Sequence, residues 1–465
     1  MLKRPKFCAA FTQRVMARRI ISAIRVSESA GENTRWQRKI MSEMLGQDMT
    51  CVVRRYFLFH RMMVLMLVGA LILGAHGLRA APGFVLQDPP KIDRWDHLNA
   101  AALCQLSRNT LAYFKRGQNQ PISDAPVLNA GAMFAEQPEV TLARVQATLD
   151  FTCRGVNQNQ ALEPDNNKQL KAAHLVKSDE FASLIKTPEL LAQYFDFYRW
   201  YPDTDTAQQH AHRSDIQGKK NILNAIPDDQ ILLTKYYTKL LNGSLVKTSK
   251  YTKALYALPH DEQGLTKAQA AQQPNLTRYR YTRQQVLAGV LDEKSLAQPL
   301  VWLTEAAVHD VLLQGTGIIE VDGQLHYFNV HRNNGIAYDY AKGKTEQARY
   351  WYFSEVSGIL GYGQQQDQKI EITPQLTVAG NIPDLGLGKL FLLSYPQDGL
   401  QVGRLAVLAD EGGAFKDNRF QLDLLVDSYY GWDDYHRDNK HLPDFVGAWM
   451  LLLKSEPEAD EILLP

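Results

Sequence analysis

The sequence predicts a mainly β protein with an α-helical N-terminal part. Two observations carry this prediction. Residues 95–192 place apolar side chains at three- and four-residue spacing, as amphipathic helices do, whereas the chain after residue 221 consists of short β-rich runs separated by Gly, Pro and Asn. Because these runs are irregularly spaced with few helical patterns between them, they favour a barrel over a doubly wound sheet. One helical interruption is predicted at residues 282–292, with Thr282 as its cap.

Length and charge exclude some classes of protein. The chain has 465 residues and 45% hydrophobic content, which is enough for one to three domains with full cores. It carries 51 Lys+Arg against 50 Asp+Glu, so its formal net charge is +1. A chain without a broad basic field is not expected to bind nucleic acid.

The N-terminal region has the pattern of a secretory signal peptide. Residues 54–61 are basic and aromatic, residues 62–77 form an apolar run of about sixteen residues, and small residues follow. This run is short for a membrane span, so we assign residues 55–81 to a cleaved signal peptide. An uncleaved signal anchor is the alternative, and it would be the chain's membrane contact. Residues 1–54 are an extension of doubtful status, and no lipidation cysteine directly follows the apolar run.

Cysteine and histidine usage gives no metal site. Cys8 and Cys51 precede the expected cleavage, which leaves Cys104 and Cys153. An even pair in an exported protein can form a disulfide, with two free buried thiols as the alternative. His210 and His212 lie in a polar stretch, residues 203–220, that we interpret as a solvated loop, because no further ligand has suitable spacing.

Three aspartates concentrate in residues 405–431, where apolar runs surround Asp410, Asp423 and Asp427, with glycines at 412 and 413. A carboxyl group held on an apolar strand loses hydration, and this raises its pKa and prepares a general acid. A solvated turn with carboxylates on its rim is the alternative interpretation.

Several segments occur together in an order that carries a family resemblance. They are LLTKYYTKLLNGS (232–244), ALYALPHD (254–261), YTRQQVLAGVL (281–291), LLQGTG (312–317), NNGIAY (333–338), LADEGGAFK (408–416) and DSYYG (427–431). With these segments the chain resembles the membrane-bound lytic murein transglycosylase A family. The resemblance implies a double-psi β-barrel and an inserted smaller β domain, with a glycan groove between them. Residues 90–250 would hold the helices and first barrel strands, residues 251–363 the insert, and residues 364–455 the returning barrel with its three-aspartate region.

The resemblance also implies an activity. Family enzymes cleave the β-1,4 bond between N-acetylmuramic acid and N-acetylglucosamine in the periplasm, without a metal or organic cofactor, and leave a 1,6-anhydro sugar. One carboxyl group acts first as acid and then as base. Asp427 matches the family's Asp-x-x-x-Gly with Gly431, so it is our first choice for this role and Asp423 is the second. Strand alternation would place Asp423, Leu425 and Asp427 on one face.

Further site residues follow from the same resemblance. Asp410, Gly412 and Gly413 are expected to support the acid, through backbone N–H groups in the case of the glycines. The residues expected to bind peptidoglycan glycan strands are Thr234, Tyr236, Tyr237, Gln314, Gly315, Thr316 and Asn334.

Departures from the family pattern keep other functions open. The family's first barrel aspartate has no counterpart, because Gly380 and Asn381 occupy its region. A non-enzymatic wall-binding barrel is therefore one rival hypothesis. An inverting glycoside hydrolase that uses two carboxylates and water is the other.

Overall fold

The computed structural model describes residues 81–119, 129–156, 181–186, 188–213, 218–339, 341–363, 366–412 and 415–455. All described residues belong to the unit Ala80–Pro465. The N-terminal extension and nearly all of the expected signal peptide lie outside the described residues. Within the described residues no helix has the length and apolar character that a membrane span requires.

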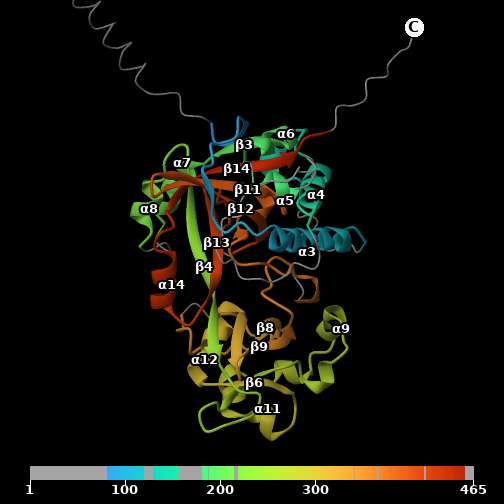
Figure 1. The fold of residues 1–465 in the computed structure, drawn as a ribbon. Helices are drawn as coiled ribbons and strands as arrows, with labels where there is room; N and C mark the ends of the chain where they lie inside the picture. The colour runs from blue at the N-terminus through green and yellow to red at the C-terminus, as the bar shows by residue number, and fades with distance from the viewer. Residues whose placement is uncertain are drawn as a thin grey trace, which may run out of the picture. The chain divides into compact units, whose positions relative to one another are not determined.

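The centre of the described unit is a closed barrel of six strands (Figure 1). Its order is β14-β11-β12-β10-β13-β4, and β4 pairs back with β14 to close the ring. Two neighbouring pairs, β10 with β12 and β4 with β13, are parallel, and the others are antiparallel. The strands are β4 (Ile231–Asn242), β10 (Thr377–Ala379), β11 (Leu390–Gln397), β12 (Leu400–Asp410), β13 (Gln421–Tyr429) and β14 (Phe445–Leu453).

Continuous apolar runs explain why these strands form the core. β11 and β14 are buried along nearly their whole length, on both faces, because one face lines the barrel interior and neighbouring elements cover the other. The sheet continues outward from β14 through β3 (Phe195–Tyr201) to β1 (Gly83–Leu86), and β2 (Arg94–Trp95) pairs with β12.

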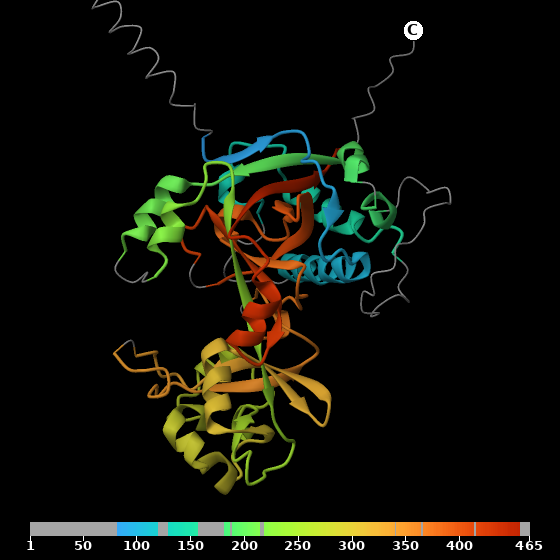
Figure 2. The same ribbon diagram turned by 60° about the vertical axis from the view of Figure 1, so that its left-hand side comes forward.

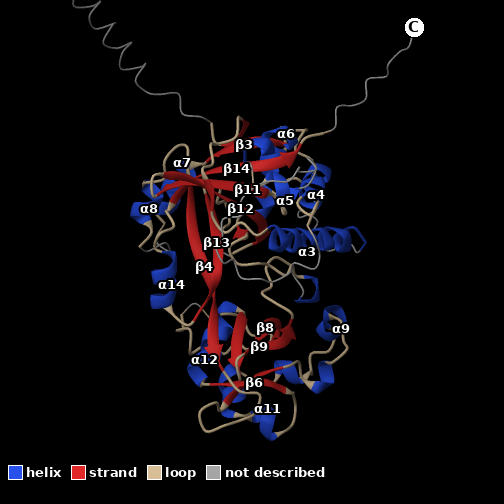
Figure 3. Ribbon diagram, viewed as in Figure 1, coloured by secondary structure: helices blue, strands red, loops and turns tan. Residues whose placement is uncertain are grey.

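Helices from the N-terminal part pack beside the barrel (Figure 3). α3 (Ala100–Asn119) and α4 (Leu142–Phe151) are joined by a disulfide between Cys104 and Cys153, which lies just after α4. Thr141 caps α4 by accepting a hydrogen bond from the Arg144 amide. The short elements of this part are η2 (Ala132–Phe134), α5 (Phe181–Leu184), η4 (Pro188–Leu190) and α6 (Leu191–Tyr194).

The predicted loop at residues 203–220 is wrong for its first half. Residues Thr204–Ala211 form α7, which begins there because the Asp203 side chain caps it through the Thr206 amide. His210 packs edge-on against Phe420, at 5.5 Å between ring centroids, so it has a packing role. α8 (Lys220–Asn224) follows, and no group of three metal-ligating side chains occurs in the described part of the chain.

Residues 253–356 form a second lobe with its own hydrophobic core. Its strands are β5 (Lys253–Tyr256), β6 (Pro299–Leu303), β7 (Thr316–Val321), β8 (Gln324–Asn333) and β9 (Trp351–Val356). The predicted helix at residues 282–292 is present as α10 (Arg283–Ala288) and α11 (Val290–Glu293), and Thr282 caps it in a capping box with Gln285. The sequence pattern missed α12 (Glu305–Gln314). The remaining helical turns are η5 (His260–Glu262), α9 (Lys267–Ala271) and η6 (Thr277–Tyr279).

One long strand belongs to both parts. β4 pairs with β13 and β14 over its first residues and with β7 through Leu240, Leu241 and Asn242 at its end. Figure 2 shows it running from the barrel into the second lobe. The predicted fold class, a mainly β chain with a barrel, helices in its N-terminal part and a smaller inserted β domain, is therefore confirmed.

Candidate functional site

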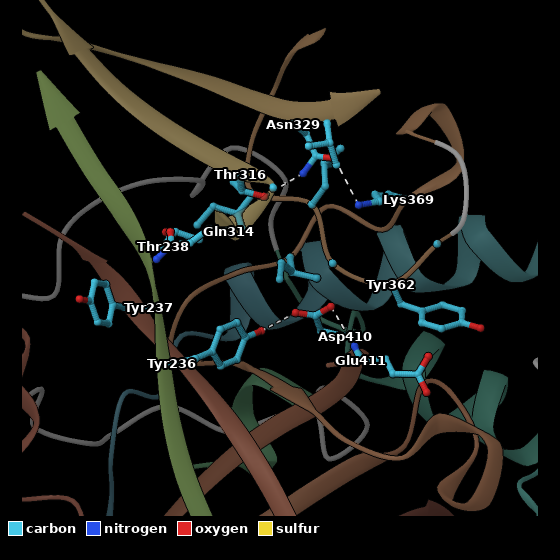
Figure 4. A pocket seen from close by; sticks show the side chains of 17 residues that line it. Tyr236, Tyr237, Thr238, Gln314, Thr316, Asn329, Tyr362, Lys369, Asp410 and Glu411 are labelled. Carbon is cyan, nitrogen blue, oxygen red and sulfur yellow. Dashed lines mark hydrogen bonds between the residues drawn. The ribbon is translucent and has the colours of Figure 1, made fainter. Parts of the chain in front are cut away.

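A cavity of about 500 Å³ lies where the barrel meets the second lobe (Figure 4). β4 supplies one wall, the start of β7 and the middle of β8 supply another, and the segment that leads back into the barrel supplies the third. The lining residues are Tyr236, Tyr237, Thr238, Gln314, Gly315, Thr316, Asn329, Val330, Ile359, Leu360, Gly361, Tyr362, Gly363, Lys369, Ile372, Asp410 and Glu411. This size is typical of a small-ligand site.

Asp410 ends β12 and places a carboxyl group in this cavity. The Tyr236 hydroxyl donates a hydrogen bond of 2.7 Å to its Oδ2, and the Glu411 amide donates one of 2.8 Å to its Oδ1. Burial of the carboxyl group raises the pKa of Asp410 to about 6, although both hydrogen bonds favour the ionised form. At neutral pH a small but useful fraction of Asp410 is therefore protonated, as a general acid requires.

Tyr236 is a reliable donor to this carboxyl group. Burial, together with the negative charge of Asp410, raises the pKa of Tyr236 well above its usual value, so the phenol keeps its proton. Figure 4 shows its hydroxyl directed at Asp410 from β4. The pairing fixes the orientation of one carboxyl oxygen and leaves the other beside the Glu411 amide.

Asp423 is a second shielded carboxyl group nearby. It lies on β13, paired with Thr234 on one side and Ala379 on the other, and it does not line the cavity. Burial raises its pKa to about 6, and the negative charge of Asp410 adds to this shift while the Thr234 hydroxyl opposes it. Among the described residues its Oδ1 is buried without a hydrogen-bond partner. Thr234, expected to bind glycan, instead lies beside Asp423 and outside the cavity lining.

Asp427 occupies a different environment. Its side chain is exposed, it accepts a hydrogen bond of 2.8 Å from the Ser428 amide, and it is not part of the cavity lining. The expected strand alternation is wrong, because a bulge between Leu425 and Asp427 inserts the buried Val426 and shifts the register against β4. Asp423 and Asp427 therefore do not share a face through regular pleating.

The segment of Gln314, Gly315 and Thr316 forms the opposite rim. Gly315 ends α12 with φ +80°, in the left-handed region that favours glycine, and this turn leads directly into β7. The Gln314 Oε1 accepts a hydrogen bond of 3.0 Å from the Lys239 amide on β4. All three residues line the cavity, as do Tyr236 and Tyr237.

Sequence reasoning missed the polar network on the β8 side. The Asn329 amide donates to the Thr316 Oγ1 at 2.8 Å, and its Oδ1 accepts from the Lys369 Nζ at 3.2 Å. Burial lowers the pKa of Lys369, while the charge of Asp410 raises it. Lys369 lies in a uniformly polar stretch of sequence, so no pattern distinguished it from a surface lysine.

Asn334, which was expected to bind glycan, is hydrogen-bonded within the second lobe. It is buried with 2% exposure. Its amide donates to the carbonyl oxygens of Tyr281 and Ala348, and its Oδ1 accepts from the Tyr350 amide. These bonds hold together three segments of the second lobe, and Asn334 is not among the residues that line the cavity.

The glycine turn after β12 borders a second, smaller cavity of about 380 Å³. Gly412 and Asn381 line it, and Glu411 lines both cavities. Asn381, which stands near the position of the missing family aspartate, is buried and caps α13 (Ile382–Leu385) through the Asp384 amide. Gly413 lies outside the described residues.

Comparison with known proteins gives one match to a family model. Residues 232–344 match the model described as the MltA specific insert domain, a range that runs from the second residue of β4 past the end of β8. The resemblance found in the sequence motifs is thereby confirmed. No curated protein matches the chain in sequence.

The solved structures that match the chain have low sequence identity to it. A membrane-bound lytic murein transglycosylase from Agrobacterium tumefaciens is 13% identical, with a TM-score of 0.47, and the match covers 80% of this chain and 98% of that one. MltA from Neisseria gonorrhoeae is 13% identical, with a TM-score of 0.44, covering 82% and 97%. Escherichia coli MltA with bound chitohexaose is 14% identical, with a TM-score of 0.42 and the same coverage.

Proposed function

Because the chain carries the MltA specific insert domain, we propose that it is a peptidoglycan lytic transglycosylase that acts in the periplasm. Its substrate would be the β-1,4 bond between N-acetylmuramic acid and N-acetylglucosamine, and its product a 1,6-anhydro-muramyl end. The observation that carries the proposal is the desolvated Asp410 carboxyl group, held by Tyr236 in a cavity bordered by the barrel and the insert.

Asp410 is the proposed proton donor. In its acid form it protonates the glycosidic oxygen, so the bond to the leaving sugar breaks and an oxocarbenium-like centre develops on the muramyl ring. The resulting carboxylate then accepts the proton of the muramyl six-position hydroxyl as that oxygen closes the ring. The Tyr236 hydroxyl stabilises the carboxylate between the two steps. No water enters the balance, because the nucleophile belongs to the substrate.

Geometry favours Asp410 over the other two aspartates. Asp410 alone of the three lines the larger cavity, whereas Asp423 lies behind it on β13 and Asp427 is exposed beyond the bulge. Asp423 would act through its negative charge, which raises the pKa of Tyr236. The sequence-based choice of Asp427 stays a prediction, and the same experiment tests it.

A two-carboxylate hydrolase is the second candidate, because Asp410 and Asp423 are both shielded and both have a pKa of about 6. An inverting hydrolase would use one of them to activate a water molecule. The two reactions differ in the mass of their products, since the anhydro product is lighter by one water.

The test is digestion of purified sacculi by the exported chain, followed by mass analysis of the released muropeptides. We expect anhydro products, a loss of about 100- to 10,000-fold in rate for Asp410→Asn, and retained sacculus binding, because the amide keeps the shape but cannot move the proton. Asp423→Asn should reduce the rate less, and Asp427→Asn least. Hydrated products would support the hydrolase, and an inactive Asp427→Asn beside an active Asp410→Asn would restore the sequence-based assignment.

A further inference from the structure

Lys369 is a cationic group in the cavity that the proposed reaction does not use. Its Nζ donates one hydrogen bond, of 3.2 Å, to the Asn329 Oδ1. An ammonium group has three donors, so two remain. Among the described residues, no carboxylate forms an ion pair with Lys369 within 4.0 Å. Figure 4 shows its amine reaching inward toward Asn329, across the cavity from Tyr236.

The ammonium group of Lys369 loses hydration free energy in this position. Lys369 is half-buried and loses hydration, and its hydrogen-bond acceptor on Asn329 is neutral. The negative charge of Asp410 compensates only in part, because the pKa of Lys369 remains lowered. A cation that is partly desolvated without an ion-pair partner favours a ligand that brings a negative charge, because the ligand completes the pairing. The remaining polar groups of the lining, such as Thr238, Gln314 and Thr316, suit the hydroxyl and amide groups of a sugar.

We propose that Lys369 binds a carboxylate carried by the muramyl residue of the substrate, and that it makes the site prefer acidic glycans over neutral ones. This inference rests on the proposed function. Lys369 and Asp410 line the same cavity, so a carboxylate held at Lys369 would belong to a sugar at or next to the bond that Asp410 attacks. Neutral chitin-type oligomers lack this group and would bind through hydroxyl and acetamido contacts alone.

Two carboxylates of peptidoglycan have the required chemistry. In a peptide-free strand the lactyl ether of the muramyl residue ends in a free carboxylate. In an intact strand that carboxyl group is amide-linked, and the nearest carboxylates belong to the stem peptide. The experiment therefore uses three glycans of similar length: neutral chitohexaose, peptide-free strands prepared with an amidase, and strands with intact stems.

The test compares the affinity of each glycan for the wild-type chain, for Lys369→Met and Lys369→Gln, and for Lys369→Arg. Glutamine can keep the hydrogen bond to Asn329 without the charge, so the glutamine variant still tests the charge if the methionine variant does not fold. Lys267→Met is the matched control, because Lys267 is exposed on α9 and does not line the cavity. Melting temperatures verify that each variant is folded.

We expect the neutral variants to lose about tenfold or more in affinity for at least one acidic glycan, as for the loss of a hydrogen bond between charged groups. Affinity for chitohexaose should stay within about twofold, and arginine should restore most of the loss. A loss confined to peptide-free strands identifies the lactyl carboxylate, and a loss confined to intact strands identifies the stem peptide.

Two results would overturn the inference. The first is unchanged affinity for both acidic glycans, and the second is an equal loss for chitohexaose, which would make Lys369 a support for Asn329 only. Either result leaves the proposed function standing if wild-type protein still releases anhydro products from sacculi. Absence of those products would refute the proposed function independently of Lys369.

Discussion

At the scale of single residues, the fold produces the unusual chemistry of the two shielded aspartates. Asp410 and Asp423 belong to different strands, and β10 lies between them, paired with both. Both carboxyl groups lose hydration, and each has a pKa of about 6, well above the usual value for aspartate. The partners differ, because Asp410 receives two hydrogen bonds while Asp423 keeps one oxygen without any. The first matches the role of proton donor proposed above, and the ionised form of the second is expected to lower stability.

The pH dependence of activity should report on Asp410. If protonated Asp410 is the donor, as proposed above, kcat/KM for anhydro-product release should fall above about pH 6, approaching tenfold per pH unit. Tyr236→Phe removes a hydrogen bond that favours the ionised carboxylate, so the decline of kcat/KM should begin at higher pH. If kcat/KM of Tyr236→Phe declines at the same pH as that of the wild type, the assignment of Asp410 as the acid is contradicted.

The pH dependence of stability should report on Asp423. Its folded-state pKa is raised, so the ionised form costs stability above about pH 6, and this cost disappears as the pH falls through 6 toward 4. Asp423→Asn should therefore raise the free energy of unfolding at pH 7.5 by about 1–3 kcal/mol, with little effect at pH 4. Denaturant unfolding at both pH values measures this, with the exposed Asp427→Asn as control. A variant less stable than wild type at pH 7.5 would show that the charge is needed for folding.

At the scale of elements, short connections and one bulge decide where functional side chains go. The bulge in β13 places Val426 in the core and separates the environments of Asp423 and Asp427. Gly315 ends α12 and starts β7 within one residue, which places Gln314 and Thr316 on the cavity rim. The disulfide between Cys104 and Cys153 joins α3 to the turn after α4, although the two cysteines are far apart in sequence.

The disulfide should contribute measurably to stability. It closes a chain segment with a sequence separation of 49, for which the loss of unfolded-state entropy corresponds to about 4 kcal/mol. Reduction of the wild-type chain should lower the denaturant midpoint accordingly, and so should Cys104→Ala combined with Cys153→Ala. The double variant is the control, because a reductant should not change its midpoint. If the denaturant midpoint of the wild-type chain does not change on reduction, the disulfide adds no stability beyond the native packing around α3 and α4.

At the scale of the whole molecule, the cavity depends on two lobes with separate hydrophobic cores. β4 connects them through its pairing with β13 and β7, and the hydrogen bond from the Lys239 amide to Gln314 adds a link close to the cavity. Tyr430 also donates a short hydrogen bond to Glu320 across the same junction. The lining therefore forms only when both lobes are folded.

Gln314→Ala should weaken glycan binding while leaving stability nearly unchanged. The side chain is exposed on the rim, so water can replace its bond to the Lys239 amide, but a bound sugar loses an amide partner worth roughly 1–3 kcal/mol. Affinity for chitohexaose and melting temperature are the measurements. Leu313→Ala is the matched control, because Leu313 is 56% exposed on the same helix and does not line the cavity. A large drop in melting temperature with unaltered affinity would make this segment a structural turn.

Local sequence patterns were enough to predict the features that depend on neighbours along the chain. Apolar periodicity separated helices from strands, and the Thr282 cap marked a helix start. Ordered motifs carried the family resemblance and drew attention to Tyr236, Gln314 and Asp410, which line the cavity. Which polar residues come together in the cavity became clear only from the folded chain. Lys369 reaches the cavity only because the chain returns from the second lobe beside Asp410. The Asn334 side chain is hydrogen-bonded to backbone groups that are distant in sequence. The reason is physical: desolvation and hydrogen bonding depend on neighbours in space, and strand alternation fails wherever a bulge shifts the register.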